Sequence, residues 1–474
     1  MDNGLQKKEF NRVLNTLDVL VVAFGAMIGW GWVVASGQWI VSGGALGTAL
    51  GFVIGGLMIY FVGLTYAELT SAMPKCGGEH VFSYAAFGPV GSFICTWAII
   101  LGYVGVVCFE AVSFPTILQY LFPGILKGYL YTIEGFDVYL SWVVIAMVMA
   151  AFITFINIIG AKTAAIFQTI LTVTIATVGI ILIAGSAFQG DVDNLKQHAF
   201  VGDSSMDILE NIIKVAIMTP FFLFGFDVIP QAAEEIKVPL RRLGRLMLLS
   251  IGLAVLFYAL VVLAIGYVMN NEQIAESMGA TGLVTADAMA IAFSSKFMAK
   301  VLILGGLCGI VTSWNSFMIG GSRAMYSMAD SYMLPQTFSR LHSKYKTPVA
   351  ALLLLGLLAI VSPLFGRAML IWIVDAANFA CCLAYCLVAI AYIFIRRRRP
   401  DLNRPFKLKH GITIGSIAIV MSGFMVLMYV LPGTNCTLTW EEWIIVGGWA
   451  ALGLAFAIRS KLLYKDKFAS GLDI

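Results

Sequence analysis

The chain has 474 residues, of which 60% are hydrophobic and 12% are charged, and its formal net charge is +4. A soluble protein of this length would carry about twice that charged fraction, so the composition excludes a soluble globular protein. So small a positive charge gives no reason to expect a nucleic-acid partner.

Apolar runs of 18 or more residues recur along the chain, as membrane-spanning helices require. The first run follows a short polar segment and is too long for a signal-peptide core, so we expect it to be retained as a span. The pattern predicts an all-α integral membrane protein with twelve spans, at about 17–42, 44–72, 90–119, 138–158, 163–187, 211–233, 243–269, 297–327, 347–365, 368–395, 411–431 and 440–460.

Basic residues set the expected orientation. Most of the 30 Lys and Arg, including Arg241, Arg242 and the run 396–399, share a side with the N-terminus. The positive-inside rule therefore predicts that both termini are cytoplasmic in a multi-pass protein of the plasma membrane. Directly after a span, the run 396–399 is read as a topology anchor and not as a nucleic-acid patch.

Span one contains the stretch GAMIGWGW at 25–32, where Gly25, Gly29 and Gly31 weaken a helix. Small residues also let membrane helices pack closely, which Gly25 and Gly29 would achieve alone. Adding Gly31 between Trp30 and Trp32 favours an unwound segment. Backbone groups exposed by such a break must line a cavity or find other partners.

Span six carries a second set of breaks, TPFFLFGFDVIP at 219–230. Pro230 cannot donate to the preceding turn, and Pro220 and Gly225 add further interruptions. Asp227 is an ionisable group at membrane depth, which is by default a functional hypothesis. Span six is therefore predicted to be discontinuous as well.

The two breaks fall in the first members of two groups of five spans. Discontinuous helices in corresponding positions of two halves indicate an inverted-repeat transporter with its site at the midplane. The expected organisation is listed here: a cytoplasmic segment 1–16, a first five-helix repeat 17–187, a second repeat 211–395, two additional spans in 411–460, and a cytoplasmic tail 461–474.

Four motifs together resemble the permeases of the amino acid–polyamine–organocation (APC) superfamily. They lie in the family's order and at its spacing: Gly25-Ala-Met-Ile-Gly29-Trp-Gly31; Tyr66-Ala-Glu68-Leu to Tyr84; Gly225-Phe-Asp227 to Arg242; and Ser322-Arg323 to Pro348. The resemblance implies a leucine-transporter-like fold with twelve transmembrane helices, a 5+5 inverted repeat, discontinuous helices 1 and 6, and no catalysis. Glu79-His80, Trp30 and Trp32 depart from the family pattern.

An amino acid zwitterion needs donors for its carboxylate and acceptors for its ammonium. The amides of Gly29, Trp30 and Gly31 would open a half-helix whose positive dipole end favours an anion. Carbonyls near Gly25 to Met27 and near Phe221 to Phe224 would accept from the ammonium. The resemblance gives the same groups the same roles, and the expected substrate-binding set is Ala26, Met27, Gly29, Trp30, Gly31, Glu110, Phe221, Phe224, Gly225, Asp227 and Trp314.

Several members of this set have a second interpretation. Phe221 matches the family's aromatic lid position, yet it is one of 32 phenylalanines and could simply pack. Asp227 could hold the ammonium or, as the blander role, cap the second half-helix. Glu110 could select a cationic amine or carry a proton, or it could form an ion pair near the outer rim. Glu68, near the inner end of span two, is expected to be structural or part of the inner gate, with Lys162 or Arg12 as its partner.

Span eight contains a G-x-x-T-S spacing at 309–313. Gly25, Ile28, Gly309, Thr312 and Ser313 would together offer five uncharged oxygens, which suits sodium and resembles the sodium site of sodium-coupled members of the fold. Some proton-coupled relatives place a lysine in mid-span five, and the stretch 168–175 has none. Alternatively, the hydroxyls of Thr312 and Ser313 bond only to their own helix.

The sequence therefore predicts a secondary active transporter for an amino acid or small amine, coupled to sodium or, less favoured, to protons. Exchange is an alternative, and a passive channel is a candidate of a different class that lacks a filter motif here. The eight cysteines and four histidines form no zinc, disulfide or nucleophile motif, so neither an enzyme nor a cofactor other than sodium is expected. The sequence does not fix the substrate, the direction of transport or the oligomeric state.

Overall fold

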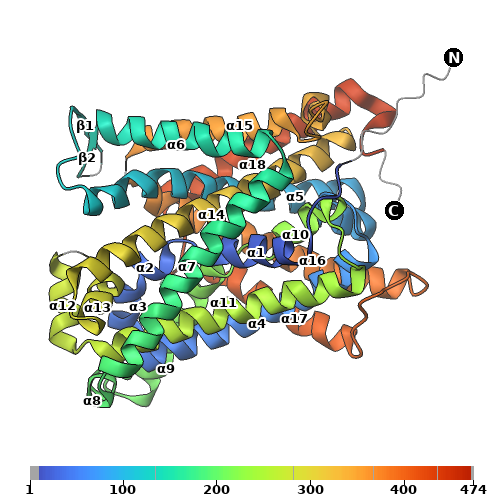
Figure 1. The fold of residues 1–474 in the computed structure, drawn as a ribbon. Helices are drawn as coiled ribbons and strands as arrows, with labels where there is room; N and C mark the ends of the chain where they lie inside the picture. Colours follow the sequence, from blue (N-terminus) through green and yellow to red (C-terminus); the bar gives the residue numbers. More distant parts are fainter. Residues whose placement is uncertain (1–9, 134, 281, 367, 435, 471–474) are drawn as a thin grey trace.

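The protein is almost entirely helical, and its long helices run roughly side by side (Figure 1). The computed structural model describes residues 10–133, 135–280, 282–366, 368–434 and 436–470, so most of the predicted segment 1–16 and the end of the tail lie outside it. In the first half of the chain the elements are α1 (Thr16–Met27), α2 (Gly31–Val34), α3 (Ser36–Gly43), α4 (Ala45–Ala72), α5 (Glu79–Leu121), β1 (Tyr129–Ile133), β2 (Phe136–Tyr139), α6 (Leu140–Ile158), α7 (Ala161–Gln189), α8 (Val192–Gln197) and α9 (Ser205–Phe222).

The second half continues with α10 (Val228–Gln231), η1 (Ala233–Glu235), α11 (Leu240–Val268), α12 (Asn271–Ala280), α13 (Val284–Ala292), α14 (Lys296–Asp330), η2 (Gln336–Ser339), α15 (Val349–Val361), η3 (Ser362–Phe365), α16 (Ala368–Arg398), α17 (Gly411–Val430), α18 (Trp440–Tyr464) and η4 (Lys465–Lys467). Among the described residues, ten helices are long and apolar enough to cross a membrane. The predicted spans 211–233 and 347–365 correspond to the broken pair α9–α10 and to the short α15 with η3. The count of twelve spans and the inverted repeat stay predictions.

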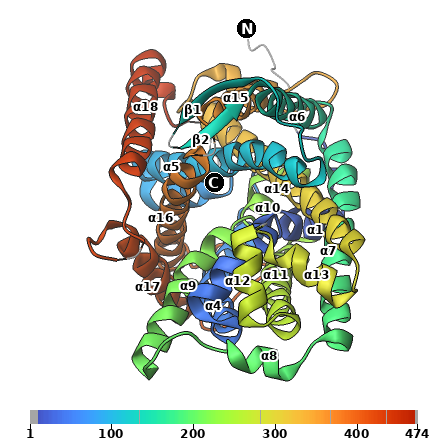
Figure 2. The same ribbon diagram turned by 90° about the vertical axis from the view of Figure 1, so that its left-hand side faces the viewer.

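The short broken elements occupy the middle of the bundle. Figure 1 shows α1 and α10 at its centre, and Figure 2 shows the long helices around them, with α18 at the edge. The α5 helix bends at Gly88, whose φ is 73°, and resumes at Pro89, a residue suited to a first helical turn. The transmembrane part of α5 therefore begins close to the predicted position 90.

A β-hairpin, β1–β2, joins α5 to α6 at one end of the bundle. The sequence analysis did not predict this hairpin, nor the short helices α8, α12 and α13 at the same end (Figure 1). They cover the end opposite the described chain ends. At the end that holds the described chain ends, Leu14 pairs with Ile236, and the Ala469 amide donates to the Ser331 carbonyl.

Three of the four motif segments, those after the first, meet in space at the end of the bundle that holds both described chain ends. The Cys76 amide donates to Glu234 Oε1 at 3.2 Å, and Ser327 Oγ donates to the Cys76 carbonyl at 3.0 Å. The Arg323 guanidinium donates to the Glu235 carboxylate, with Nε to Oε1 at 2.7 Å. Both side chains of that ion pair are buried, so losing either would leave an unpaired charge away from water.

Gly225 combines a positive φ with a close approach between the two breaks. Its φ of +135° lies in the region that favours glycine, and a Cβ there would come 2.6 Å from the Cβ of Ala26. The two predicted breaks thus contact each other directly, backbone against backbone.

We expect Gly225→Ala to destabilise the protein by about 1–3 kcal/mol, because the new methyl group adds backbone strain and overlaps Ala26. Gly252→Ala is the matched control, since a Cβ at Gly252 inside α11 meets nothing within 4 Å. The temperature at which the detergent-solubilised protein aggregates should fall by several degrees for Gly225→Ala alone. Equal temperatures for the two variants would contradict the close approach of the breaks.

Candidate functional site

The break in span one lies where the sequence predicts it, since α1 ends at Met27 and α2 begins at Gly31. On the α1 side of the break, the hydroxyl groups of other helices donate hydrogen bonds to the free carbonyls. Thr312 Oγ1 donates to the Gly25 carbonyl at 3.0 Å, and Tyr258 OH donates to the Met27 carbonyl at 2.8 Å. By contrast, the amides of Gly29, Trp30 and Gly31 donate none of the hydrogen bonds found among the described residues.

The break in span six runs from Leu223 to Asp227, between α9 and α10. The Gly225 amide donates to Asp227 Oδ1 at 3.0 Å, and so it is turned away from the α9 carbonyls. In the described part of the chain, the carbonyls of Phe221, Leu223 and Phe224 accept no backbone or side-chain hydrogen bond. Buried backbone groups are almost always paired, so this set of free donors and free acceptors needs an explanation.

A small cavity of about 30 Å³ lies between the two breaks. It is lined by Ala26, Met27, Gly29, Trp30, Gly31, Val106, Phe109, Glu110, Phe221, Phe222, Phe224, Tyr258, Ser313 and Phe317. Eight of the predicted substrate-binding residues therefore come together here, while Gly225, Asp227 and Trp314 lie outside the lining. The volume holds about two water molecules, so any larger ligand requires the walls to move.

Glu110 brings a carboxylate to this cavity from α5. A Cβ placed on Gly29 would lie 3.1 Å from Glu110 Oε1 and 3.4 Å from Ser313 Oγ, so both side chains border the same glycine. Glu110 is buried, its Oε2 has no partner, and it belongs to none of the ion pairs among the described residues. The alternative of an ion pair near the outer rim is therefore wrong in this structure.

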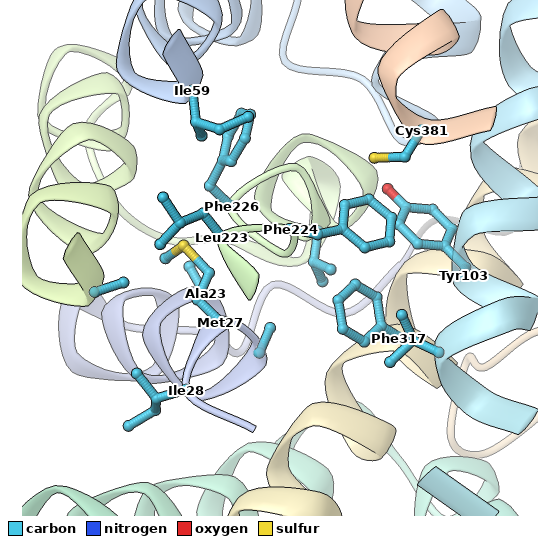
Figure 3. Packing of buried hydrophobic residues seen from close by; sticks show 14 of the residues in the cluster. Ala23, Met27, Ile28, Ile59, Tyr103, Leu223, Phe224, Phe226, Phe317 and Cys381 are labelled. Carbon is cyan, nitrogen blue, oxygen red and sulfur yellow. The ribbon is translucent and has the colours of Figure 1, made fainter. Parts of the chain in front are cut away.

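Aromatic rings close the cavity on two sides. Phe221 meets the Phe109 ring edge-on at 6.0 Å between centroids. On another side the Phe224 ring stacks on Phe317 at 4.9 Å and on Tyr103 at 5.6 Å. Figure 3 shows the Phe224 ring beside those of Tyr103 and Phe317. Phe221 thus lines the cavity, as a lid residue would, and also packs against neighbouring rings.

Asp227 lies in a second layer behind Phe224. Tyr103 OH donates to its Oδ2 at 2.5 Å, and Tyr385 OH donates to its Oδ1 at 3.0 Å. Its side chain makes no capping hydrogen bond to α10, so the expected capping role is wrong. The carboxylate instead ties α10 to α5 and α16, which closes this side of the cavity with polar contacts as well as with rings.

The residues of the predicted sodium site are only partly assembled. Thr312 Oγ1 lies 3.0 Å from the Gly25 carbonyl oxygen and 2.9 Å from that of Gly309, so three of the five expected oxygens converge. Ser313 instead faces Gly29 and the cavity, and no contact assigns the Ile28 carbonyl to the group. The neutral oxygens fit a sodium ion, provided that Thr312 rotates its proton away from the two carbonyls.

A buried polar network beside this group was missed at the sequence level. Asn157 donates to Asn315 at 2.9 Å, Asn315 to Gln168 at 2.8 Å, and Gln168 to Ser316 at 2.9 Å. Ser316 in turn donates to the Val22 carbonyl at 3.0 Å, which links three long helices to α1. Amide side chains in mid-span are the signal that could have identified it.

The three tryptophans near the breaks occupy different environments: Trp30 lies at the cavity as expected, whereas Trp314 does not. Trp30 lines the cavity, and its ring packs against Gly306. Trp32 is buried away from the cavity, edge-on to Phe257 at 5.2 Å between centroids. Trp314 is also fully buried, so of these three tryptophans only Trp30 contacts the space between the breaks.

The expected partner of Glu68 was wrong. Glu68 is buried, and it pairs with Arg396 at 2.8 Å and with Arg404 at 3.1 Å, not with Lys162 or Arg12. Arg396 belongs to the run that was read purely as a topology anchor. These two ion pairs fix α16 and the loop after it to the C-terminal end of α4.

Comparison with known proteins gives a consistent result. A family model described as amino acid permease matches residues 14–456. The branched-chain amino acid permease BcaP of Bacillus subtilis is 26% identical over 452 residues, covering 93% of this chain and 92% of the relative. The methylthioribose transporter of the same organism is 23% identical, covering 94% and 93%. Its aspartate–proton symporter is 25% identical, covering 88% and 79%.

We expect Asp227→Asn to destabilise the protein by about 1–3 kcal/mol. Asp227 accepts from two tyrosine hydroxyls and one amide, and an asparagine would turn an N–H donor toward at least one of them. Asp203→Asn, in an exposed loop, is the control. Thermal aggregation in detergent should separate the two variants by several degrees. If Asp227→Asn behaves like Asp203→Asn, the three contacts do not support the layer.

Proposed function

The chain belongs to the amino acid permease family, and from this premise we propose that it moves an amino acid or a closely related small amine across the plasma membrane by alternating access. The family model spans most of the chain, and the relatives above are transporters with similar length. One observation carries the proposal. Gly29, Trp30 and Gly31, whose amides donate no hydrogen bond among the described residues, line the same cavity as Phe221 and Phe224, whose carbonyls accept none there.

Those groups match the two ends of a zwitterion. The amides open a helical segment, where a carboxylate is favoured by the N–H groups and by the local dipole. The carbonyls supply acceptors for an ammonium group. The apolar rings of Phe109, Phe221 and Phe224 would then surround the side chain, and their movement would give the volume that the closed cavity lacks.

Alternating access would follow from a difference between the two ends of the bundle, because the path from the cavity is closed by more layers toward one end than toward the other. Toward the end with both chain ends, Phe224, the Asp227 layer and the buried ion pairs of Glu235 and Glu68 lie in succession. Toward the other end, Phe109 and Phe221 form the main barrier beside the cavity. In the proposed orientation, with both termini cytoplasmic, this is an arrangement closed on the inside. Opening inward would need α1 and α10 to move with the segments 13–14 and 235–237, which are hydrogen-bonded to each other.

Ion coupling is proposed on the oxygens around Thr312. Sodium is favoured because the group near Thr312 and Gly25 consists of neutral oxygens, and mid-span α7 offers Gln168, Thr172 and Ile175 in place of a lysine. Proton coupling is the second candidate, and two observations support it. Glu110 is a buried carboxylate in the cavity wall, and one relative is an aspartate–proton symporter. An exchanger without a coupling ion, or a passive channel, would use the same cavity.

The function is tested by reconstituting the full chain in liposomes and measuring uptake of labelled amino acids and amines, with sodium and proton gradients imposed separately. The proposal predicts saturable accumulation above equilibrium, driven by one of the gradients. Accumulation only against a preloaded substrate would indicate exchange. Flux that equilibrates without saturation would indicate a channel and would overturn the proposal. Because a methylthioribose transporter is also similar to the chain, that compound belongs in the panel.

For the sodium proposal, the double variant Thr312→Ala and Ser313→Ala should abolish stimulation by sodium, because it removes the Thr312 hydroxyl beside the Gly25 and Gly309 carbonyls together with the Ser313 hydroxyl that the sequence predicts for the site. The control is Thr174→Ala with Thr177→Ala, whose exposed hydroxyls bond only to carbonyls of their own helix, those of Ile170 and Val173. Uptake should be measured at several sodium concentrations at constant pH. Undiminished stimulation in the first variant would exclude this sodium site.

For Glu110, we expect Glu110→Gln to change either the charge preference among substrates or the pH dependence of uptake. The carboxylate lies beside Gly29 and has no cationic partner in the described part of the chain, so its charge acts directly on the cavity. Glu210→Gln, at an exposed position, serves as the control. The measurement is uptake of neutral and cationic substrates across a pH series. If neither the charge preference nor the pH dependence changed, Glu110 would have a structural role only.

A further inference from the structure

A long apolar groove lies on the outside of the bundle, away from the central cavity. It has a volume of about 510 Å³ and runs between α18 and the neighbouring helices α5 and α16. In Figure 2, α18 is at the edge of the molecule next to these two helices. The groove is lined by Pro89, Val90, Phe93, Ile94, Trp97, Ala98, Leu101, Phe379, Ala380, Leu383, Val446, Trp449, Ala450, Leu454, Ala457, Ile458, Lys461 and Phe468. All but one of these side chains are uncharged and predominantly apolar.

A pair of stacked tryptophans defines the wall. The rings of Trp97 and Trp449 lie 4.4 Å apart between centroids at an angle of 14°. Each indole N–H donates to the backbone carbonyl of the other residue at 2.8 Å. A Cβ on Gly453 would lie 2.4 Å from Trp97 Nε1, so α18 approaches α5 closely at this level. The groove is therefore a built feature, held at a fixed width by these contacts.

The groove has the length of one leaflet. Along α5 it extends from Pro89 to Leu101, which is about 18 Å at the helical rise. Half the hydrocarbon core of a bilayer is about 15 Å. Val90 and Ile458 are 71% and 52% exposed, so the groove opens toward the acyl chains of the surrounding bilayer.

The end of the groove is basic. Lys461 lines it, is exposed, and forms none of the ion pairs among the described residues. Across the mouth, Arg398 donates to the Ala86 carbonyl at 3.4 Å, just before the bend at Gly88 that leads into the groove. In the proposed orientation this end lies at the cytoplasmic surface, where basic pockets between membrane helices bind anionic headgroups.

We propose that the groove is a binding site for an anionic phospholipid of the inner leaflet. Its acyl chain lies along α5 and α18, and its phosphate lies at Lys461. The apolar lining recognises the chain, and the lysine recognises the headgroup charge. A zwitterionic lipid has a cationic group in its own headgroup, so it would gain less binding free energy from Lys461. A second copy of this protein is a poorer fit, because an isolated lysine at the mouth of a concave apolar groove would need a matching acidic side chain. The site is separate from the transport cavity and goes beyond the proposed function.

The test uses the purified full chain in mild detergent, with phosphatidylglycerol and phosphatidylcholine of identical chains as probes. Native mass spectrometry gives lipid retention and affinity, and thermal aggregation gives stabilisation. Lys461→Gln should weaken phosphatidylglycerol binding about five-fold and leave phosphatidylcholine unchanged. Arg459→Gln is its control, because Arg459 is exposed on the same helix but does not line the groove.

Filling the groove tests the chain half of the site. Ala450→Trp should reduce retention of both lipids, whereas Ala451→Trp, at an exposed neighbour outside the lining, should not. The proposal is overturned if Lys461→Gln and Arg459→Gln bind phosphatidylglycerol equally, or if Ala450→Trp retains lipid like Ala451→Trp. A shift from dimer to monomer in Ala450→Trp alone, with unchanged lipid retention, would assign the groove to a second copy and also overturn it.

Discussion

The last turn of α1, which leads into the first break, packs directly against the unwound turn before α10, and the rest of the structure is arranged around that contact. A backbone group without a partner is costly at membrane depth, so neither break could face lipid. Gly225 allows the approach because it has no side chain to meet Ala26. Helices α5, α11 and α14 then supply the hydroxyls and rings that surround the joined breaks. What stays unpaired is a set of amides on one turn and carbonyls on the other.

Glu110 changes the electrostatics of this arrangement. The amides near Gly29 are suited to an anion, yet the protein already places a carboxylate beside them. A second carboxylate, from a substrate, would require a proton or a cation in the same space. The proposed ion coupling and the proposed substrate recognition are thus linked, because both depend on balancing the negative charge in the cavity. Thr312, which donates to the Gly25 carbonyl, is the sequence neighbour of Ser313 in the cavity wall, so a sodium ion at the proposed site would contribute to that balance.

The sequence was sufficient for the broken helices but not for the partners of the charged residues. Glycine and proline act on the local backbone, so GAMIGWGW and the stretch around Pro230 predicted the breaks correctly. Glu68 finds Arg396 more than 300 positions away, and Asp227 finds tyrosines on two other helices instead of capping its own. Such pairings depend on how helices pack, which one sequence does not encode locally. The same holds for Trp32, which faces Phe257, while Trp30 reaches the cavity.

The central claim is that the two breaks recognise the two charged ends of one amino acid. It is tested most directly by competition binding to the purified protein, using a transported amino acid, its decarboxylated amine and its N-acetyl derivative. The account predicts that losing either charged end weakens binding by at least about 100-fold, because buried donors or acceptors are then left unpaired. Equal binding of the amine and the amino acid would contradict the account, since the amides at Gly29 to Gly31 would then hold no carboxylate.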